Sequence, residues 1–444
     1  MKNAEAVAEF IKKAQTTDFP PEVIEAAKRA LTDWFCVSIG GSAEPVTLYT
    51  AKAAASWAGV GQAFLLSGGQ TTPAAAAMIN GTAGHALDYD DTHVRSVTHI
   101  GSPTIAATMA VASHQGLEEG EVLAAIIAGY ETAARIGRGL GQPTNMRGFH
   151  ATGIFGSFGA TAAAAVLAKL SPNAVKNAMG LTATQVSGLT ASFGSMAKPF
   201  HAGKAAFNGV LAVEMAAAGF EARTDLIEPK NGLNQALFPD GSHHITEFNF
   251  GDGWEINQNT FKPYAACLLT HAVIDGARSL AKATDSREIK QIRLYVGEPA
   301  IRLAGIQQPE TPLQGKFSLA FCVALGLGGY GASESDFAMA RISDPNLRRV
   351  MGRVQLVPET SLADTSSRVE VEFIDGKNLV AEVPVALGNP ENPMSYNDMW
   401  NKFEPLVRPK LGTNTEELFD CLSGFERHGS MSRALSLVTE RRNS

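Results

Sequence analysis

The chain has 444 residues, of which 45% are hydrophobic and 18% charged, proportions typical of a globular protein with a large core. Its net charge of -7 argues against nucleic acid and against an anionic membrane surface as partners. The four cysteines are scattered without a CxxC pair, which argues against a zinc knuckle or a disulfide framework and fits a reducing cytoplasm. Because polar residues interrupt every long apolar run, neither a signal peptide nor a membrane span is expected.

The first half of the chain shows apolar residues at helical spacing. Ser102-Pro103 and Ser171-Pro172 are typical helix starts, with an N-cap serine and proline at the first helical position. No strand pattern is convincing before residue 255. The expected helices cover residues 4–14, 21–39, 46–58, 72–90, 103–116, 118–139, 152–170, 172–184 and 199–219.

Strand patterns begin in the second half. Residues 291–296 and 353–357 alternate with period two, and residues 367–384 predict a hairpin that turns at Asp375-Gly376. Helical patches lie at 271–282, before these strands, and at 317–327, between them, and helical spacing returns from Tyr396. The sequence therefore predicts a mainly α protein: a large all-helical domain, residues 1–255 with 392–444, that carries an inserted smaller α+β domain, residues 256–391.

The stretch from 85 to 103 is unusually dense in ionisable residues. It holds three of the ten histidines and three aspartates, and unpaired charges are costly in a buried setting. If the preceding helix continues to Asp90, then His85, Asp88 and Thr92 share one of its faces. Asp90 and Asp91 would point elsewhere, to cap or to pair.

Arg95 and His99 follow in the loop that leads to the next helix. A helix N-terminus favours an anion there, so the stretch fits a carboxylate substrate with Asp and His as proton-transfer groups. A metal site stays open, since His and Asp bind metals, although no HExxH-like spacing supports it. A salt-bridged helix end is the third interpretation.

Three further clusters add cations and histidines. His150 precedes a Gly/Ala-rich helix and is either a catalytic imidazole or a buried core residue. A second cluster at a helix start is either a carboxylate clamp or a solvated basic turn. The third opens the α+β domain, where a cleft between domains is a common place for a site. The second cluster consists of Lys198, His201 and Lys204, and the third of Lys262, Tyr264 and His271.

Common nucleotide and hydrolase motifs are absent. The chain contains no Walker A sequence and no G-x-S-x-G elbow. The glycine-rich run at 137–141 follows a predicted helix rather than a strand. A nucleotide cofactor is therefore not expected.

Five motifs in consistent order resemble those of the MmgE/PrpD family. The first is the sequence NGTAGHALDYDDT, from Asn80 to Thr92, which is similar to the central signature of that family. The resemblance extends from about residue 5 to residue 390. The other four motifs are FHATG from Phe149 with FGATAAA from Phe158, KPFHAGKAA from Lys198 with Asn208-Gly209, Lys262-Pro-Tyr with His271, and ETP from Glu310 with Lys316-Phe-Ser318.

This resemblance implies a helical domain with an α+β lid domain, a homodimer, and chemistry on small di- or tricarboxylates without cofactor or metal. By match to the family motifs, it also implies the catalytic residues and two further candidates, Lys262 and His271. The expected catalytic residues are Asp88, Thr92, His99, His150 and Lys198. The expected substrate-binding residues are His85, Arg95, His201, Lys204, Lys262 and His271.

The expected activity is that of a cytoplasmic lyase, a dehydratase similar to 2-methylcitrate dehydratase, which moves a proton α to a carboxylate. An epimerase or a decarboxylase of a related acid is the first alternative, and a non-catalytic polycarboxylate-binding protein is the second. The chain departs from some relatives at Phe321, where certain lyases place tyrosine, and at Cys267, where histidine occurs.

Overall fold

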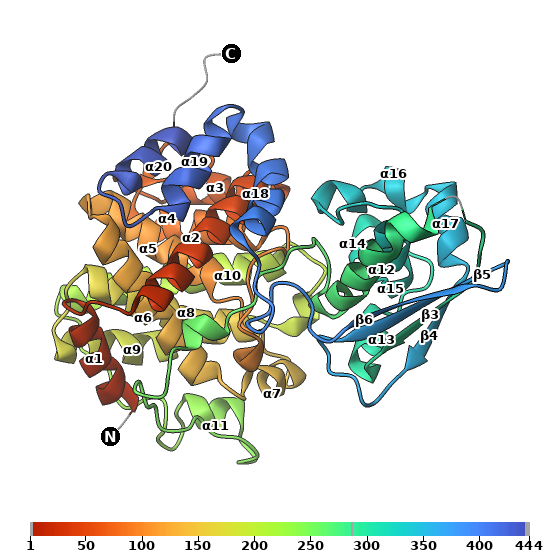
Figure 1. The fold of residues 1–444 in the computed structure, drawn as a ribbon. Helices are drawn as coiled ribbons and strands as arrows, with labels where there is room; N and C mark the ends of the chain where they lie inside the picture. The colour runs from red at the N-terminus through yellow and green to blue at the C-terminus, as the bar shows by residue number, and fades with distance from the viewer. Residues whose placement is uncertain (1–2, 286, 440–444) are drawn as a thin grey trace. The chain divides into compact units, whose positions relative to one another are not determined.

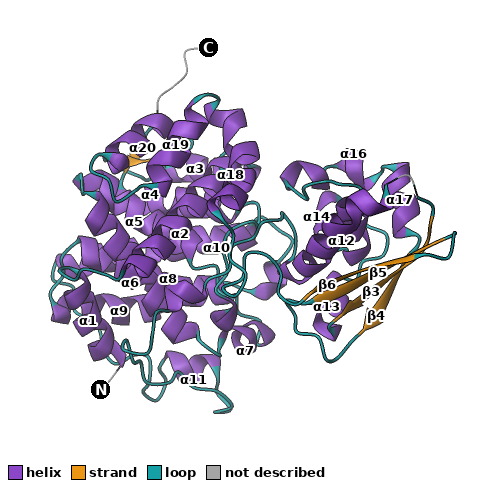
Figure 2. Ribbon diagram, in the orientation of Figure 1, coloured by secondary structure: helices purple, strands orange, loops and turns teal. Residues whose placement is uncertain are grey.

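A computed structural model describes residues 3–285 and 287–439 (Figure 1). The chain divides into two compact units, residues 1–260 with 406–444 and residues 261–405. The first unit is mainly helical, and the second contains a four-stranded sheet (Figure 2). Among the described residues, no helix is both long and apolar enough to cross a membrane.

The predicted helices of the first unit are present, with ends shifted by a few residues at most of them. Two short helices, α7 and α11, were not predicted. The helices are α1 Asn3–Ala14, α2 Pro21–Gly41, α3 Pro45–Ala54, α4 Pro73–His85, α5 Gly101–Gln115, α6 Glu119–Gly137, α7 Gly141–Met146, α8 Ala151–Leu167, α9 Pro172–Ala183, α10 Ala197–Ala217, α11 Leu233–Leu237, α19 Asn414–Ser423 and α20 Ser430–Thr439, while α18 Tyr396–Leu411 lies across the boundary of the two units.

Small residues set the distances between the central helices α4, α5, α8 and α10. A Cβ on Gly203 of α10 would lie 2.1 Å from Oγ1 of Thr82 and 2.3 Å from the carbonyl oxygen of Met78, both on α4. A Cβ on Gly209 would lie 2.6 Å from Cβ of Ala160 on α8. The alanine and glycine content of these segments thus permits backbone contact, and it fixes α10 against both neighbours.

Three predictions for this unit are wrong. It is not all-helical, because β1 (Ala63–Phe64) and β2 (Gln70–Thr71) form an antiparallel pair. Helix α4 ends at His85 rather than Asp90. Ser102 lies inside α5, whose N-cap is Ile100, because the Ser102 hydroxyl bonds to a side chain instead. The N-cap prediction for Ser171 is confirmed, since its hydroxyl accepts a hydrogen bond from the backbone N–H of Ala174.

The sheet of the second unit has the strand order β4-β3-β5-β6. Strand β3 (Ile289–Val296) is parallel to β4 (Val354–Pro358) and antiparallel to β5 (Ser367–Phe373). Strands β5 and β6 (Asn378–Val383) form the predicted hairpin, whose Gly376 has a φ of +81°. The helices of this unit are α12 His271–Thr284, α13 Glu298–Ala304, α14 Pro312–Lys316, α15 Leu319–Leu327, α16 Met339–Ile342 and α17 Pro345–Met351.

The core of this unit lies between one face of the sheet and helices α12 and α15. Alternate residues of β5 are buried, as period-two spacing predicts. Val369 and Val371 of β5 pack with Val273 of α12 and Val323 of α15, all of them fully buried. The predicted strands and the two predicted helical patches therefore belong to one α+β core.

Candidate active site

The loop after α4 carries the densest group of ionisable side chains. Asp88 has a φ of +53°, a left-handed conformation that aspartate tolerates better than most residues. The loop then reaches Thr92, which exchanges backbone hydrogen bonds of 2.8 and 2.9 Å with Thr260. His85, Asp88 and Thr92 therefore do not share a helix face, and this prediction is wrong because α4 has already ended.

Asp90 is the centre of the hydrogen-bond network. Its carboxylate lies 2.9 Å from Nδ1 of His85 and 3.2 Å from Nδ1 of His99, and it accepts a 2.6 Å hydrogen bond from the hydroxyl of Ser102. Burial alone would raise the pKa of Asp90, but the charges and hydrogen bonds of the two histidines hold it well below its usual range. Asp90 is therefore ionised, and it orients both imidazoles through Nδ1–H.

His85 is a neutral base in this arrangement. Burial lowers its pKa to about 4, although the charge of Asp90 opposes that effect. Because Nδ1–H donates to Asp90, the lone pair lies on Nε2. In the described part of the chain, no partner lies within hydrogen-bonding distance of this buried Nε2. An unsatisfied buried acceptor of this kind is suited to take a proton.

Lys198 supplies the cation. It lies in the first turn of α10, and its Nζ is 2.8 Å from Oδ2 of Asp88. The other oxygen of Asp88 is 3.8 Å from Nε2 of His99. The Nζ of Lys198 also lies 5.4 Å from the centre of the Phe193 ring, so an aromatic side chain lies beside its charge. An incoming carboxylate would meet the ammonium of Lys198 at this point.

His150 completes the group of histidines. It is the N-cap residue of α8 and is 3% exposed. Its ring stacks on that of His85, with the ring centres 5.8 Å apart, and is nearly perpendicular to that of Phe193, with the centres 4.9 Å apart. Its Nδ1 lies 3.1 Å from Nδ1 of His201. Burial, followed by the charges of His85 and Lys198, lowers the pKa of His150 far below its usual value, so this imidazole is neutral.

Asp91 holds the loop in place through three hydrogen bonds. Its Oδ1 accepts a hydrogen bond of 3.2 Å from the backbone N–H of Gly101. Its Oδ2 accepts bonds of 2.5 Å from the hydroxyl of Tyr130 and 2.6 Å from Nδ2 of Asn259. Burial and the charge of Asp33 raise the pKa of Asp91 to about 7. Asp91 thus ties the loop to the N-terminus of α5 and to α6.

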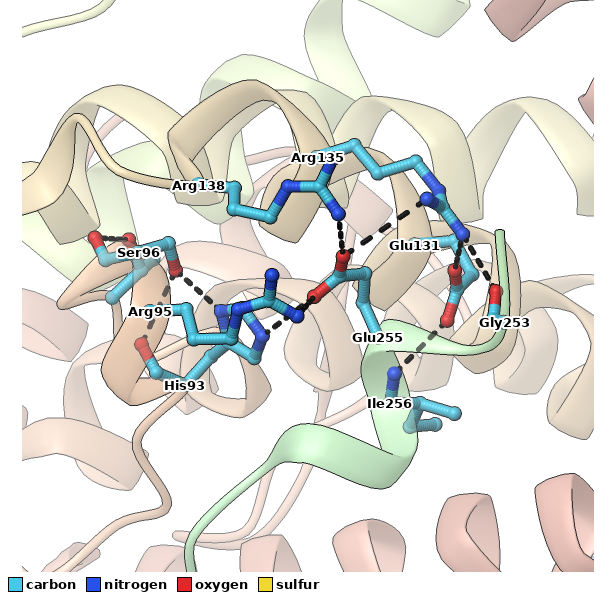
Figure 3. Close-up of polar contacts among 10 residues, drawn as sticks. His93, Arg95, Ser96, Glu131, Arg135, Arg138, Gly253, Glu255 and Ile256 are labelled. Atoms are coloured by element: carbon cyan, nitrogen blue, oxygen red, sulfur yellow. Dashed lines mark hydrogen bonds and ion pairs between the residues drawn. The ribbon is translucent and has the colours of Figure 1, made fainter. Parts of the chain in front are cut away.

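Arg95 lies in a different cluster, around the buried Glu255. Figure 3 shows the Glu255 carboxylate among basic side chains. Its oxygens lie 2.8 Å from Nη1 of Arg138, 3.5 Å from Nη1 of Arg95 and 3.2 Å from Nε2 of His93. Burial would raise the pKa of Glu255, but the hydrogen bond from His93 and the charges of the arginines lower it to about 2. The structure therefore places Arg95 on an internal carboxylate that anchors the loop, and the sequence did not reveal this partner.

The remaining predicted residues have contacts of their own. Lys204 bonds to Asn208, one turn further along α10. Lys262 and His271 belong to the second unit, where both are buried and Nε2 of His271 lies 3.2 Å from the carbonyl oxygen of Ala266. Phe321, also in that unit, is fully buried against Phe337. The structure thus brings together, within the first unit, His85, Asp88, Asp90, Thr92, His99, His150, Lys198 and His201.

The same residues include a donor set of metal-binding type. One ligand atom from each of His85, Asp88, Asp90 and His99 lies within 4.8 Å of the others. All four groups are already engaged, since Asp88 pairs with Lys198 while His85 and His99 both pair with Asp90. A cation would have to compete with the ammonium of Lys198, and we assign no metal to this position.

The site thus places two histidines on one shared carboxylate beside a lysine, on a mainly α scaffold. The chain matches the MmgE/PrpD N-terminal domain over residues 5–246 and the MmgE/PrpD C-terminal domain over residues 264–422. The protein therefore belongs to the MmgE/PrpD family, as the sequence motifs predicted.

Several relatives are cis-aconitate decarboxylases. The chain is 25% identical over 468 residues to cis-aconitate decarboxylase of Aspergillus terreus, which covers 97% of this chain and 95% of that protein. It is 23% identical over 471 residues to the cis-aconitate decarboxylase-like protein oryM of Aspergillus oryzae, with 97% and 96% covered. The human cis-aconitate decarboxylase is 24% identical over 381 residues, with 79% and 78% covered.

Proposed function

We propose that the protein is a cofactor-free lyase that acts on a small di- or tricarboxylate by proton transfer next to a carboxylate, with decarboxylation of cis-aconitate or a close analogue as its reaction. The observation that carries the proposal is the placement of Lys198 and Asp88 beside three histidines, two of which share Asp90. The relatives support decarboxylation over the dehydration expected from the sequence.

The chemistry of such a substrate fits these residues. In cis-aconitate, the CH2 that bears one carboxylate is joined to a carbon–carbon double bond. Loss of CO2 from this CH2 shifts the double bond, and the former vinylic carbon takes up a proton. Lys198 would stabilise the negative charge that develops, and the neutral His150 would donate the proton from Nε2.

The test compares turnover of two variants with that of the unmodified chain. Cis-aconitate is incubated with the protein, and CO2 release and product are followed by NMR. We expect Lys198→Met and His150→Ala each to lower kcat/KM roughly 100-fold, because each loses a group that acts on the developing charge. Lys12→Met, a change at an exposed lysine, is the matched control. Full turnover in both site variants would overturn the proposal.

Dehydration of a citrate-like acid is a second candidate, and the free lone pair at Nε2 of His85 favours it. This nitrogen could remove a proton α to a carboxylate while a neighbouring histidine protonates the leaving hydroxyl. A panel of hydroxy acids assayed for water loss separates the two reactions. Thermal stabilisation by a polycarboxylate without any turnover would instead indicate a binding protein, and a stoichiometric bound metal would contradict the cofactor-free proposal.

A further inference from the structure

His150 and His201 face one another through the same type of ring nitrogen. Their Nδ1 atoms lie 3.1 Å apart. A hydrogen bond at this distance needs one donor and one acceptor, so a single proton is shared between the two nitrogens. The tautomer of either ring therefore determines the tautomer of the other.

The backbone at Gly188 holds both rings in this arrangement. Its carbonyl oxygen accepts a 3.0 Å hydrogen bond from the backbone N–H of His150. A Cβ at this position would lie 3.0 Å from Nδ1 of His201, and the φ of +128° is one that glycine adopts readily. The contact is thus part of the packing and does not depend on one rotamer of an exposed side chain.

The two histidines differ in their access to water. His150 is 3% exposed, whereas His201 is half-buried. In the described part of the chain, the structure gives His201 no hydrogen bond at Nε2, and its Nδ1 bonds to His150. The pair therefore extends from the buried site towards solvent, with His201 at the outer end.

A charge on His150 is unfavourable. Burial has the largest effect on its pKa and lowers it. The charges that His85, Lys198, His99 and His201 carry when protonated lower it further. Asp88 and Asp90 are already paired with Lys198 and with the other two histidines. A proton that reaches Nε2 of His150 must therefore be matched by loss of the proton at Nδ1.

We propose that His201 relays protons between solvent and His150 through the Nδ1–Nδ1 hydrogen bond, so that His150 exchanges a proton with substrate while it remains neutral. The proposal rests on the proposed function. His201 is a positioning residue in this scheme, since it acts through His150. The assignment differs from the substrate-binding role expected from the sequence.

The steps balance in either direction. When His150 gives its Nε2 proton to carbon, its Nδ1 takes the proton from Nδ1 of His201, and water supplies one to Nε2 of His201. When His150 instead removes a proton from carbon at Nε2, its Nδ1 proton passes to His201, which releases one to water from Nε2. Both imidazoles end neutral, and only the tautomers have changed.

The first test needs no substrate. The full chain, labelled with 15N histidine, is titrated in the absence of ligand while ring nitrogen shifts are followed by NMR. A charged His201 carries N–H at both nitrogens, so Nδ1 of His150 must then accept and its proton must lie on Nε2. We expect the His150 signals to follow the titration of His201 without reaching the shift of a charged imidazole.

The variant His201→Asn should abolish this step, because its amide can bond at the same place but does not ionise. His243→Asn is the matched control, since His243 is exposed and bonds to Ser242, and it should leave the step unchanged. The relay would be overturned if the ring nitrogen shifts of His150 did not change as His201 titrates, or if they reached the values of a charged imidazole.

The second test is kinetic. We expect His201→Asn and His201→Ala to lower kcat about tenfold or more, with KM changed less than about twofold, and added imidazole to restore part of the rate of the alanine variant. Unchanged kcat, or a loss that lies in KM alone, would overturn the relay. Absence of turnover in the unmodified chain, with the NMR coupling intact, would overturn the proposed function and leave the relay supported.

Discussion

Asp91 has an environment that opposes its own charge. It is 3% exposed, and its pKa rises to about 7 through burial and the charge of Asp33. Between the unfolded value near 3.8 and the folded value near 7, the folded state binds more protons than the unfolded state. The free energy of unfolding therefore falls as the pH rises through this window, and Asp91 lowers stability at neutral pH by about 4 kcal/mol at most.

We predict that Asp91→Asn makes thermal stability less sensitive to pH between about 4 and 7, the window set by these pKa values. In the unmodified chain, Oδ1 of Asn259 is buried without a partner among the described residues. If the Asn259 amide flips by 180° in the variant, this oxygen can accept a hydrogen bond from the new amide. The measurement is the thermal midpoint at a series of pH values, with Asp252→Asn at an exposed position as the control. Identical pH dependence in the variant and the unmodified chain would contradict the assignment.

The residues of the site were predicted from the sequence better than their contacts were. Asp88, His99, His150 and Lys198 were expected and do lie together. Asp90 was expected only to cap or to pair, whereas it holds both histidines. The reason is that the spacing of His85 and Asp88 fits a helix face, whereas α4 ends at His85. Asp90 is then held by a tertiary hydrogen bond from Ser102, which leaves no signal in the spacing.

At the scale of elements, glycines in α10 determine where its first turn lies. Gly203 has no room for a methyl group, because the nearest atoms include the backbone carbonyl of Met78 at 2.3 Å from the added Cβ. That carbonyl belongs to α4 and cannot rotate away. The same helix carries Lys198 and His201 within the five residues before Gly203, so its separation from α4 also fixes the distance from Lys198 to Asp88.

We predict that Gly203→Ala lowers the free energy of unfolding by about 1–3 kcal/mol through overpacking, and that it lowers activity as Lys198 moves from Asp88. Gly120→Ala is the matched control, because it lies in helix α6 with nothing within 4 Å of the added Cβ, and it should gain up to about 1 kcal/mol. Both quantities are read from the thermal midpoint and from turnover. Equal midpoints for the two variants would contradict this view of the packing.

The elements that the sequence failed to predict share a physical cause. The strands β1 and β2 have two residues each, too few for a period-two pattern to register. Phe64 of β1 is held by the side chain of Asn80 on α4. The Nδ2 of Asn80 donates a hydrogen bond of 2.9 Å to the carbonyl oxygen of Phe64. A tertiary contact of this kind leaves no periodic signal, whereas the hairpin at Gly376 has both the alternation and the turn residue.

At the scale of the whole molecule, the C-terminal segment is part of the first unit. Lys28 of α2 lies 2.9 Å from Glu426, and Glu119 of α6 accepts a 2.9 Å hydrogen bond from the backbone N–H of Met431. Helix α19 packs on α2, with Leu418 and Leu422 fully buried. The return of helical spacing after the strands pointed to this segment, but its docking partner could not be deduced from spacing, since many helices offer similar apolar faces.

We predict that Leu422→Ala loosens α2, α19 and α20 together while the sheet β3–β6 keeps its protection. The cavity left by the leucine should cost about 2–5 kcal/mol in the unit that contains it, and hydrogen exchange measured by mass spectrometry reports such losses segment by segment. The matched variant is Leu294→Ala, at a fully buried position of β3, which should raise exchange in α12, β3 and β5 instead. If either variant raised hydrogen exchange equally throughout the described chain, the two units would unfold as one. The division of the chain at residues 260 and 406 would then not correspond to two separately unfolding units.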